Sequence, residues 1–402
     1  MNYEWSVNME YRKLGGTGRL VSSIGLGCEH LDRKPYEQVK ETVDSALECG
    51  VNIFDVFMPG REIRENIAKA LGDRRGQLMI QGHIGSTDIK QQYDISRDMP
   101  TVKKYFEDIL RLFGGYIDFG MMFFIDSEKD YSDVFETDFI RYVEHLKKQG
   151  DIGHIGFSSH NPKTAIKAIN TGIPEMLMFS INPAFDMLPF KEYVLDHIQK
   201  GIPSELFRGI DPERADLYKL CEIKQIGITA MKAFGAGKLL SPEHSPFAEP
   251  LTAPQCIHYA LSRPSVACVL PGCQTPGEMR DAMRYFDVDN SERDYSGILR
   301  TVRNDFRGSC VYCSHCQPCP EEIDIASVNK CLDIARLNIG DIPQSVRSNY
   351  LGVAHNASEC TSCGNCENRC PFSVPIMENM KEATKLFAKD MGDKPPHGGI
   401  VS

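Results

Sequence analysis

Strand-like and helix-like segments alternate eight times between about residue 22 and residue 290, and this repeat constrains the fold more than any other feature of the sequence. Each expected strand is short and apolar, and it precedes a segment whose apolar residues recur at helical spacing. The expected strands are residues 22–28, 52–57, 78–85, 116–126, 154–160, 175–182, 227–234 and 265–273. Near-continuous apolar strands separated by helices are typical of parallel sheets. Eight such units in roughly 250 residues predict a closed (β/α)8 TIM barrel.

An open, doubly wound parallel sheet is the alternative arrangement for this repeat. It would place a G-x-G-x-x-G motif after the first strand, but the residues there read GLGCEH (25–30). The alternation stops after Asp294, where a cysteine-rich region begins. We therefore predict an α/β chain with a barrel over residues 1–296, a small α-helical domain over 297–390 and a flexible tail over 391–402.

Eight of the fifteen cysteines fall in two short stretches of the predicted second domain. They are Cys310, Cys313, Cys316 and Cys319 in the first stretch, and Cys360, Cys363, Cys366 and Cys370 in the second. The second stretch follows C-x2-C-x2-C-x3-C-P, in which three thiolates bind one [4Fe–4S] cluster and the fourth reaches a second cluster. Zinc is the alternative, but zinc sites usually use two C-x2-C pairs separated by a longer loop.

These cysteines therefore predict a ferredoxin-like iron–sulfur domain with two [4Fe–4S] clusters on eight thiolates. The first stretch ends with a spacing of two residues instead of three. Which of its thiols serve which cluster is consequently left open. We expect the other seven cysteines to be small buried hydrophobic residues: Cys28, Cys49, Cys221, Cys256, Cys268, Cys273 and Cys331.

Charge and composition exclude several classes of partner. The net charge of -10 argues against sequence-independent binding of nucleic acid or anionic lipid, because both need a basic surface. No segment is long and apolar enough to span a membrane. We therefore expect a cytoplasmic protein, in which clustered thiols act as metal ligands or redox groups and not as disulfides. The expected partners are a small-molecule substrate and a redox partner protein.

Several motifs in order along the chain resemble the aldo/keto reductases, in the bacterial subgroup with a C-terminal ferredoxin-type domain. They are YRKLGGTG (11–18), VSSIGLG (21–27), NIFD (52–55), IGFSSHNP (155–162), AMKAFGAGKL (230–239) and the paired cysteine stretches. The resemblance covers nearly the whole chain. It implies a (β/α)8 barrel, a nicotinamide cofactor bound without a Rossmann motif, and an active site at the carboxyl ends of the strands.

The resemblance also implies four catalytic groups: a Tyr that donates a proton, a Lys and an Asp that tune it, and a His that orients the substrate. Asp55 stands where the Asp belongs. The other three positions differ, because FMPGRE (57–62) has Met58 or Pro59 in place of the Tyr, His83 replaces the Lys and Phe123 replaces the His. These departures predict that simple aldehydes are poor substrates.

Polar residues at the ends of the predicted strands supply candidate catalytic groups, because barrel active sites are built there. The candidates are Asp55, His83, His30, His160 and Lys232, and Asp126 lies at the same end. An imidazole can donate and accept a proton near neutral pH. We therefore expect His83 to replace the missing phenol while Asp55 fixes its tautomer, and we expect Lys232 to support the cofactor electrostatically.

Contacts to a nicotinamide cofactor, NAD(P)H, are implied by the resemblance. The residues expected to contact it are Ser158, Ser159, Asn182, Met231, Lys232, Gly272 and Arg280. The segment PGCQTPGEM (271–279) matches a phosphate-binding segment, yet it lacks basic residues for a 2′-phosphate, and Arg280 is the nearest one. NADH and NADPH thus stay open. A flavin is a further candidate, since it passes electrons between a two-electron hydride carrier and one-electron clusters.

Three functions are consistent with these features. We favour an iron–sulfur oxidoreductase that moves electrons or hydride between a nicotinamide or flavin cofactor, the clusters and a small organic substrate. The alternatives are a non-redox lyase or isomerase that uses His83 and Asp55, and an electron-transfer protein whose barrel has lost its chemistry. The sequence identifies neither the substrate, the direction of electron flow nor the oligomeric state.

Overall fold

The chain forms two compact units, Met1–Asp289 and Asn290–Ser402. The computed structural model describes residues 9–89, 92–189, 191–207, 209–299, 308–337 and 339–388. The sequence pattern places the division after residue 296, whereas the structure divides between Asp289 and Asn290. The predicted tail at 391–402 lies outside the described residues.

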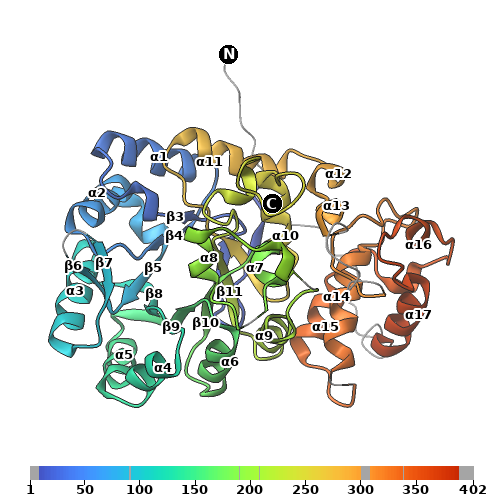
Figure 1. The fold of residues 1–402 in the computed structure, drawn as a ribbon. Coiled ribbons are helices and arrows are strands. Elements are labelled where there is room, and N and C mark those ends of the chain that lie inside the picture. Colours follow the sequence, from blue (N-terminus) through green and yellow to red (C-terminus); the bar gives the residue numbers. More distant parts are fainter. Residues whose placement is uncertain are drawn as a thin grey trace. The chain divides into compact units, whose positions relative to one another are not determined.

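The first unit is built on a sheet of eight parallel strands (Figure 1). In order around the sheet they are β3 (Leu26–Gly27), β4 (Ile53–Val56), β5 (Met79–Ile84), β8 (Ile117–Met122), β9 (Ile152–Ser159), β10 (Met176–Ser180), β11 (Gly227–Met231) and β12 (Val266–Val269). Ile24 bridges Val269 in parallel, and the Gly27 N–H donates to the Pro271 carbonyl at 2.9 Å. These bonds join the first strand to the last, so the predicted barrel is confirmed.

Helices follow the strands and surround the sheet (Figure 1). They are α1 (Tyr36–Glu48), α2 (Arg61–Leu71), α3 (Met99–Leu112), α4 (Glu128–Phe135), α5 (Asp138–Gln149), α6 (Pro162–Asn170), α7 (Pro183–Met187), α8 (Val194–Lys200), α9 (Pro212–Ile223), α10 (Ala253–Leu261) and α11 (Pro276–Met283). Many begin at a side-chain cap with Pro in the first turn. Asn161, for example, accepts from the Lys163 N–H at 3.0 Å, and Pro162 starts α6.

Two hairpins and short 3-10 turns complete the first unit. The hairpins pair β1 (Tyr11–Lys13) with β2 (Leu20–Ser22), and β6 (Ser86–Ile89) with β7 (Gln92–Ile95). The 3-10 turns are η1 (Glu29–Leu31), η2 (Gly72–Gln77), η3 (Ser204–Leu206), η4 (Lys238–Leu240) and η5 (Arg284–Phe286). No helix in the described part of the chain is long and apolar enough to cross a membrane.

The β1–β2 hairpin packs against the end of the barrel where the strands begin. Gly15 in its turn has φ +52°, and a Cβ there would lie 2.3 Å from the Gln225 carbonyl oxygen and the Gly227 nitrogen. Leu14 is fully buried in one cluster with Phe119, Met176 and other barrel residues. The amino ends of the strands are therefore filled, and the carboxyl ends remain for a site.

The described part of the second unit is helical. It contains α12 (Asn290–Arg293), α13 (Ser296–Leu299), α14 (Ile325–Arg336), α15 (Gln344–Leu351), η6 (Ala357–Glu359), α16 (Asn365–Arg369) and α17 (Ile376–Phe387). Asn379 of α17 donates to Asn329 of α14 at 2.7 Å, and the rings of Tyr350 and Phe387 stack at 4.1 Å. The two cysteine stretches lie in the loops and short helix between these packed helices.

The seven cysteines outside the two stretches behave largely as small hydrophobic residues. Six are buried, and Cys49 is intermediate. Burial raises the pKa of the Cys221 and Cys256 thiols. The expectation of buried, inert thiols is therefore confirmed for six of the seven.

Candidate active site

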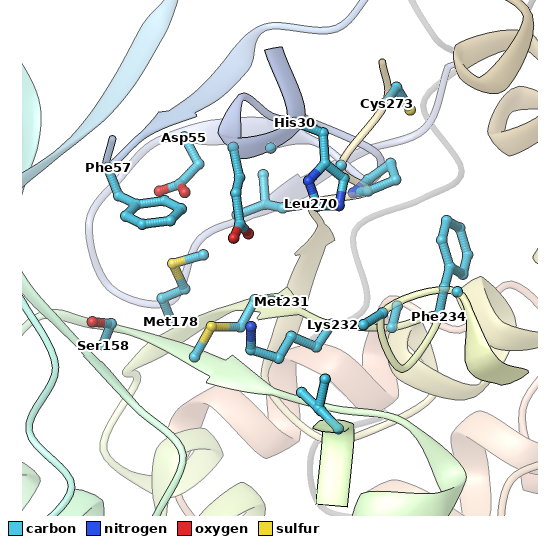
Figure 2. Close-up of a pocket in the computed structure, with 18 of the residues that line it drawn as sticks. His30, Asp55, Phe57, Ser158, Met178, Met231, Lys232, Phe234, Leu270 and Cys273 are labelled. Carbon is cyan, nitrogen blue, oxygen red and sulfur yellow. The ribbon is translucent and has the colours of Figure 1, made fainter. Parts of the chain in front are cut away.

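A cavity of about 620 Å³ opens at the carboxyl ends of the barrel strands. Its lining includes all five candidate catalytic residues: His30, Asp55, His83, His160 and Lys232. Each comes from a different part of the barrel, since Asp55 lies in β4, His83 in β5 and His160 directly after β9. Figure 2 shows Asp55 and Phe57 on one side of the cavity and Met231 and Lys232 on another.

Asp55 and His83 form a buried pair at the base of this cavity. His83 Nε2 lies 2.8 Å from Asp55 Oδ1, and their side chains are only 1% and 3% exposed. Gln81, two residues before His83 on the same face of β5, donates to the same oxygen at 2.9 Å. Both carboxylate contacts arise because β4 and β5 are parallel neighbours, with Asp55 opposite Gln81. The other ring nitrogen, His83 Nδ1, is buried and has no hydrogen-bond partner in the part of the chain that the structure describes.

A second pair of the same kind joins Asp126 and His160. His160 Nδ1 lies 2.9 Å from Asp126 Oδ2, while Asp126 Oδ1 accepts from the His160 backbone N–H at 2.6 Å. Tyr193 donates its phenol proton to Asp126 Oδ2 at 2.9 Å. Burial alone would raise the pKa of Asp126, but the charge and hydrogen bonds of His160 and the bond from Tyr193 lower it. His160 Nε2 is buried, and no described residue bonds to it.

Aromatic rings form one wall of the cavity beside His83. The Phe123 ring stacks on Phe57 at 5.7 Å and meets the His83 ring edge-on at 5.4 Å. Tyr93 of β7 packs against both phenylalanines and also lines the cavity. Burial, with a contribution from Glu29, raises the pKa of the Tyr93 phenol. This wall therefore presents apolar rings together with one phenol that stays protonated at neutral pH.

Three residues of the cavity lining, Phe124, Lys232 and Ala236, have a positive φ that residues other than glycine rarely adopt. Phe124 has φ +59° and Lys232 has φ +58°. Arg97 donates to the carbonyls of Phe123 and Phe124 at 2.8 and 2.9 Å, and Ser158 Oγ accepts from the Phe124 N–H at 2.9 Å. Such strain persists only where neighbouring groups impose it and is typical of functional sites. Arg97 and Ser158 thus hold the turn that carries Phe123 and Phe124.

Replacing Arg97 with methionine is expected to lower the barrel's free energy of unfolding by about 2–3 kcal/mol, because two hydrogen bonds from a charged donor are lost. The measurement is urea unfolding followed by circular dichroism. Arg61→Met removes an arginine whose ion pair with Glu65 is exposed on both sides, so it should change stability by less than about 1 kcal/mol. Equal stability of the two variants would contradict this role for Arg97.

The sequence model of the aldo/keto reductase family matches residues 23–250, which is more than half of the chain. The chain belongs to the aldo/keto reductase family. It is accordingly an oxidoreductase, as the sequence predicts.

Known proteins similar to this aldo/keto reductase agree with the family. An uncharacterized oxidoreductase, YqkF, of Bacillus subtilis is 24% identical over 304 residues, which cover 68% of this chain and 90% of the relative. The structure of AKR11C1 from Bacillus halodurans in its holo form matches with a TM-score of 0.56 and 19% identity, covering 74% of this chain and 97% of its own. A putative aldo-keto reductase from Pseudomonas aeruginosa matches with a TM-score of 0.54 and 18% identity, covering 71% and 97%. These structures share the fold of the barrel.

The structure of this aldo/keto reductase separates the seven predicted cofactor residues into two groups. Ser158, Met231, Lys232 and Gly272 line the cavity, whereas Ser159, Asn182 and Arg280 do not. Asn182 caps α7 by accepting from the Phe185 N–H at 2.9 Å, and its amide donates to the Lys232 carbonyl at 2.9 Å. Ser159 contacts the Ile125 carbonyl and Asp126. Asn182 and Ser159 therefore hold the turns around the cavity.

Four cysteines of the second unit surround one small cavity. Its lining includes Cys319 from the first stretch together with Cys360, Cys363 and Cys366 from the second. Cys319, the last cysteine of the first stretch, thus lies around the same cavity as the first three cysteines of the second stretch.

Charges act between several of the remaining four cysteines. Burial, with repulsion from Asp294 and Cys370, raises the pKa of the Cys313 thiol to about 12. Burial, followed by the charges of Cys313, Cys370 and Cys366, raises the pKa of Cys316, so one of these charges belongs to the first group of four. Burial also raises the pKa of Cys310, with contributions from Cys313, Asp333 and Cys316. Within the described residues no group of three or more His, Cys, Asp or Glu could hold a metal ion. Metal binding by the eight cysteines therefore stays a prediction.

Proposed function

We propose that this aldo/keto reductase transfers hydride between a nicotinamide cofactor and a small carbonyl or alcohol substrate, with His83 and Asp55 as its acid/base pair and with two [4Fe–4S] clusters in its second unit. One observation carries the catalytic part. The buried His83 imidazole lies 2.8 Å from the buried Asp55 carboxylate in the lining of the cavity, where the resemblance implies the family's Lys and Asp. A polar lining of this kind favours an enzyme over a barrel that has lost its chemistry.

The residues present fit the nicotinamide end of such a cofactor. When bound, the nicotinamide supplies or accepts a hydride. Ser158 Oγ accepts from the Phe124 N–H, so its own proton is free to bond a carboxamide oxygen in the cavity. Met231 offers an apolar surface beside it. In the loop after β11, Lys232, Gly235, Ala236 and Gly237 all have positive φ, and such turns present backbone N–H groups that suit a pyrophosphate.

His83 would transfer the proton in this reaction. With its Nε2–H held by Asp55, the neutral ring has a basic Nδ1, and the imidazolium has an acidic Nδ1–H. In carbonyl reduction the substrate carbon receives the hydride, its oxygen receives the proton from His83 Nδ1, and Asp55 stabilises the imidazolium before transfer. In alcohol oxidation the same nitrogen removes the hydroxyl proton. A positioned proton donor of this kind is worth roughly 10²–10⁴ in rate.

The positions of the cysteines in the second unit favour two clusters with crossed ligands. Cys319, Cys360, Cys363 and Cys366 line one cavity, and Cys310, Cys313, Cys316 and Cys370 form the complementary set. This is the arrangement expected of two-cluster motifs, in which the fourth cysteine of each stretch ligates the other cluster. When bound, the clusters supply one-electron transfer.

A flavin in the barrel cavity is the alternative cofactor, since it could exchange electrons with both a hydride donor and the clusters. A redox partner protein and a cytoplasmic location also belong to this proposal. The flavin and the partner follow from the iron–sulfur part, because clusters deliver electrons one at a time to a second carrier. The cytoplasmic location fits clustered thiols that stay reduced and bind metal.

A redox-neutral lyase or isomerase is a second candidate function. It is favoured by one observation. Two histidines of a single cavity, His83 and His160, are each bonded to an aspartate, and the other ring nitrogen of each has no partner among the described residues. Two acid/base groups could remove a proton at one position and return it at another without any change in substrate redox state.

Turnover with deuterated cofactor separates these functions. Aldehydes, ketones and alcohols would be screened anaerobically with NADH labelled with deuterium at C4 or with NAD⁺, and products examined by mass spectrometry. We expect deuterium in the product of the best substrate. We also expect simple aldehydes to be poor substrates, because a positioned proton donor is worth roughly 10²–10⁴ in rate and the family's phenol is missing. Conversion without deuterium would support the lyase or isomerase, and fast reduction of simple aldehydes would contradict the altered mechanism.

A further inference from the structure

We infer that the cavity takes NADH and rejects NADPH, because the lining at and after the segment 271–279, which resembles the family's phosphate-binding segment, carries carboxylates where a 2′-phosphate would need cations. This inference rests on the proposed nicotinamide function and adds the choice of dinucleotide to it.

The α11 part of the cavity lining carries carboxylates. The lining includes the Asp55–His83 pair and Lys232 of the barrel, and Glu278 and Asp281 of α11. Among its described residues, Lys232 is the one lysine, and none is an arginine. The α11 part of the lining thus offers carboxylates and no strong cation.

Helical spacing explains why the predicted phosphate ligand cannot serve. Glu278, Asp281 and Ala282 line the cavity at positions i, i+3 and i+4 of α11, so they share one face of the helix. Arg280 lies between them in sequence and therefore on the opposite face. The charge of Arg280 acts on Cys49, at the end of α1. Burial raises the pKa of the Cys49 thiol, and Arg280 lowers it. The nearest basic residue of the segment thus points away from the cavity.

The turn before α11 is already occupied by a carboxylate of the chain itself. Glu278 Oε2 accepts from the Gln274 N–H at 2.6 Å, while the Glu278 N–H donates to Thr275 Oγ at 3.2 Å. The Gln274 carbonyl is fixed by the Gln38 amide at 2.9 Å. Backbone N–H groups at a helix start usually receive phosphate. Here the Glu278 carboxylate accepts from such an N–H group instead. Burial raises the pKa of the Cys273 thiol to about 12, and the charges of Glu278 and Asp281 contribute to this rise.

These contacts discriminate between the two dinucleotides through charge. A phosphate monoester carries about −1.5 to −2 charges at neutral pH, and two carboxylates beside it would repel it. A ribose 2′-hydroxyl can instead donate a hydrogen bond to a carboxylate, which is how acidic residues select NAD in other dinucleotide sites. Because Glu278 and Asp281 are exposed to solvent, screening reduces the effect. We expect a preference of about tenfold.

Equilibrium binding to the full-length protein tests this inference. Dissociation constants for NADH and NADPH would be measured by cofactor fluorescence at low and high salt. We expect NADH to bind about tenfold more tightly at low salt and the ratio to shrink as salt rises. Glu278→Gln with Asp281→Asn should bring the ratio close to one, and Asp281→Lys should favour NADPH. Asp287→Asn removes a nearby exposed carboxylate outside the lining and should leave the ratio unchanged.

The outcomes distinguish this inference from the proposed function beneath it. If neither dinucleotide binds, the nicotinamide function fails and the inference fails with it. If NADPH binds as tightly as NADH or more tightly, the inference is overturned while the nicotinamide function stands. A preference for NADH that survives both the double substitution and high salt would show that Glu278 and Asp281 are not its cause.

Discussion

Substituting His83 with alanine or Asp55 with asparagine is expected to lower turnover of the substrate found in the screen by about 10²–10⁴-fold. Each change removes half of a buried pair in which the carboxylate fixes the tautomer and stabilises the imidazolium. Because the two residues act as a unit, the double variant should be little slower than either single variant. Steady-state kinetics measure the loss, while NADH affinity and the visible spectrum should stay nearly unchanged.

The barrel offers a matched control for this experiment. His154 of β9 forms another histidine–carboxylate contact, with His154 Nδ1 at 2.9 Å from Glu175 Oε1, but neither residue lines the cavity. His154→Ala should therefore leave turnover unchanged even where it lowers stability. If His83→Ala keeps its activity, the chemistry belongs to His160, His30 or Lys232, and His83 is a packing residue.

Pairs of cysteine substitutions should remove either half or all of the iron, depending on which thiols are paired. Cys310→Ala with Cys370→Ala damages one proposed ligand set and should leave about four irons per chain. Cys360→Ala with Cys370→Ala affects both sets and should leave almost none. The two results would be reversed if each stretch held its own cluster. Iron and acid-labile sulfide would be assayed on anaerobically purified full-length protein.

Cys331→Ala is the control for these pairs, since this buried cysteine of α14 belongs to neither set. It should keep the iron content of the unmodified protein. Equal iron in both double variants would contradict both the crossed arrangement and the arrangement in which each stretch holds its own cluster.

The barrel could be predicted because its signals are local and repeated. Each strand is an apolar run followed by a helix, and caps such as Asn161–Pro162 mark where helices begin. The β6–β7 hairpin within residues 86–95 could not be foreseen in this way. It is a short insertion between a strand and its helix, and its side chains reach the cavity only through tertiary packing.

The candidate site likewise contains residues that local sequence patterns predict and residues that they do not. Asp55 and His83 end neighbouring parallel strands, so their meeting follows from the order of the strands. Tyr93 and Tyr193 reach the site from a hairpin and a loop, and no local pattern points to them. Asn182 shows the reverse case, because its Asn–Pro sequence is a helix-capping signal, and in the structure the side chain caps α7.

Arg280 shows the limit of predicting a ligand from position along the chain, which ignores the direction of the side chain. Its neighbours at 278, 281 and 282 share the face that lines the cavity, and a residue two places after Glu278 falls on the opposite side of a helix. Helical spacing in the sequence is therefore sufficient to exclude Arg280 from the cavity once Glu278 and Asp281 face it.

The iron and sulfide content of the anaerobically purified protein, measured with zinc in the same sample, tests most directly whether this aldo/keto reductase is an iron–sulfur enzyme. Two clusters on eight thiolates predict about eight irons and eight sulfides per chain, with a brown visible absorption. About four of each would mean that only one ligand set is a cluster site. Zinc without sulfide or visible colour would contradict an iron–sulfur role for the eight cysteines.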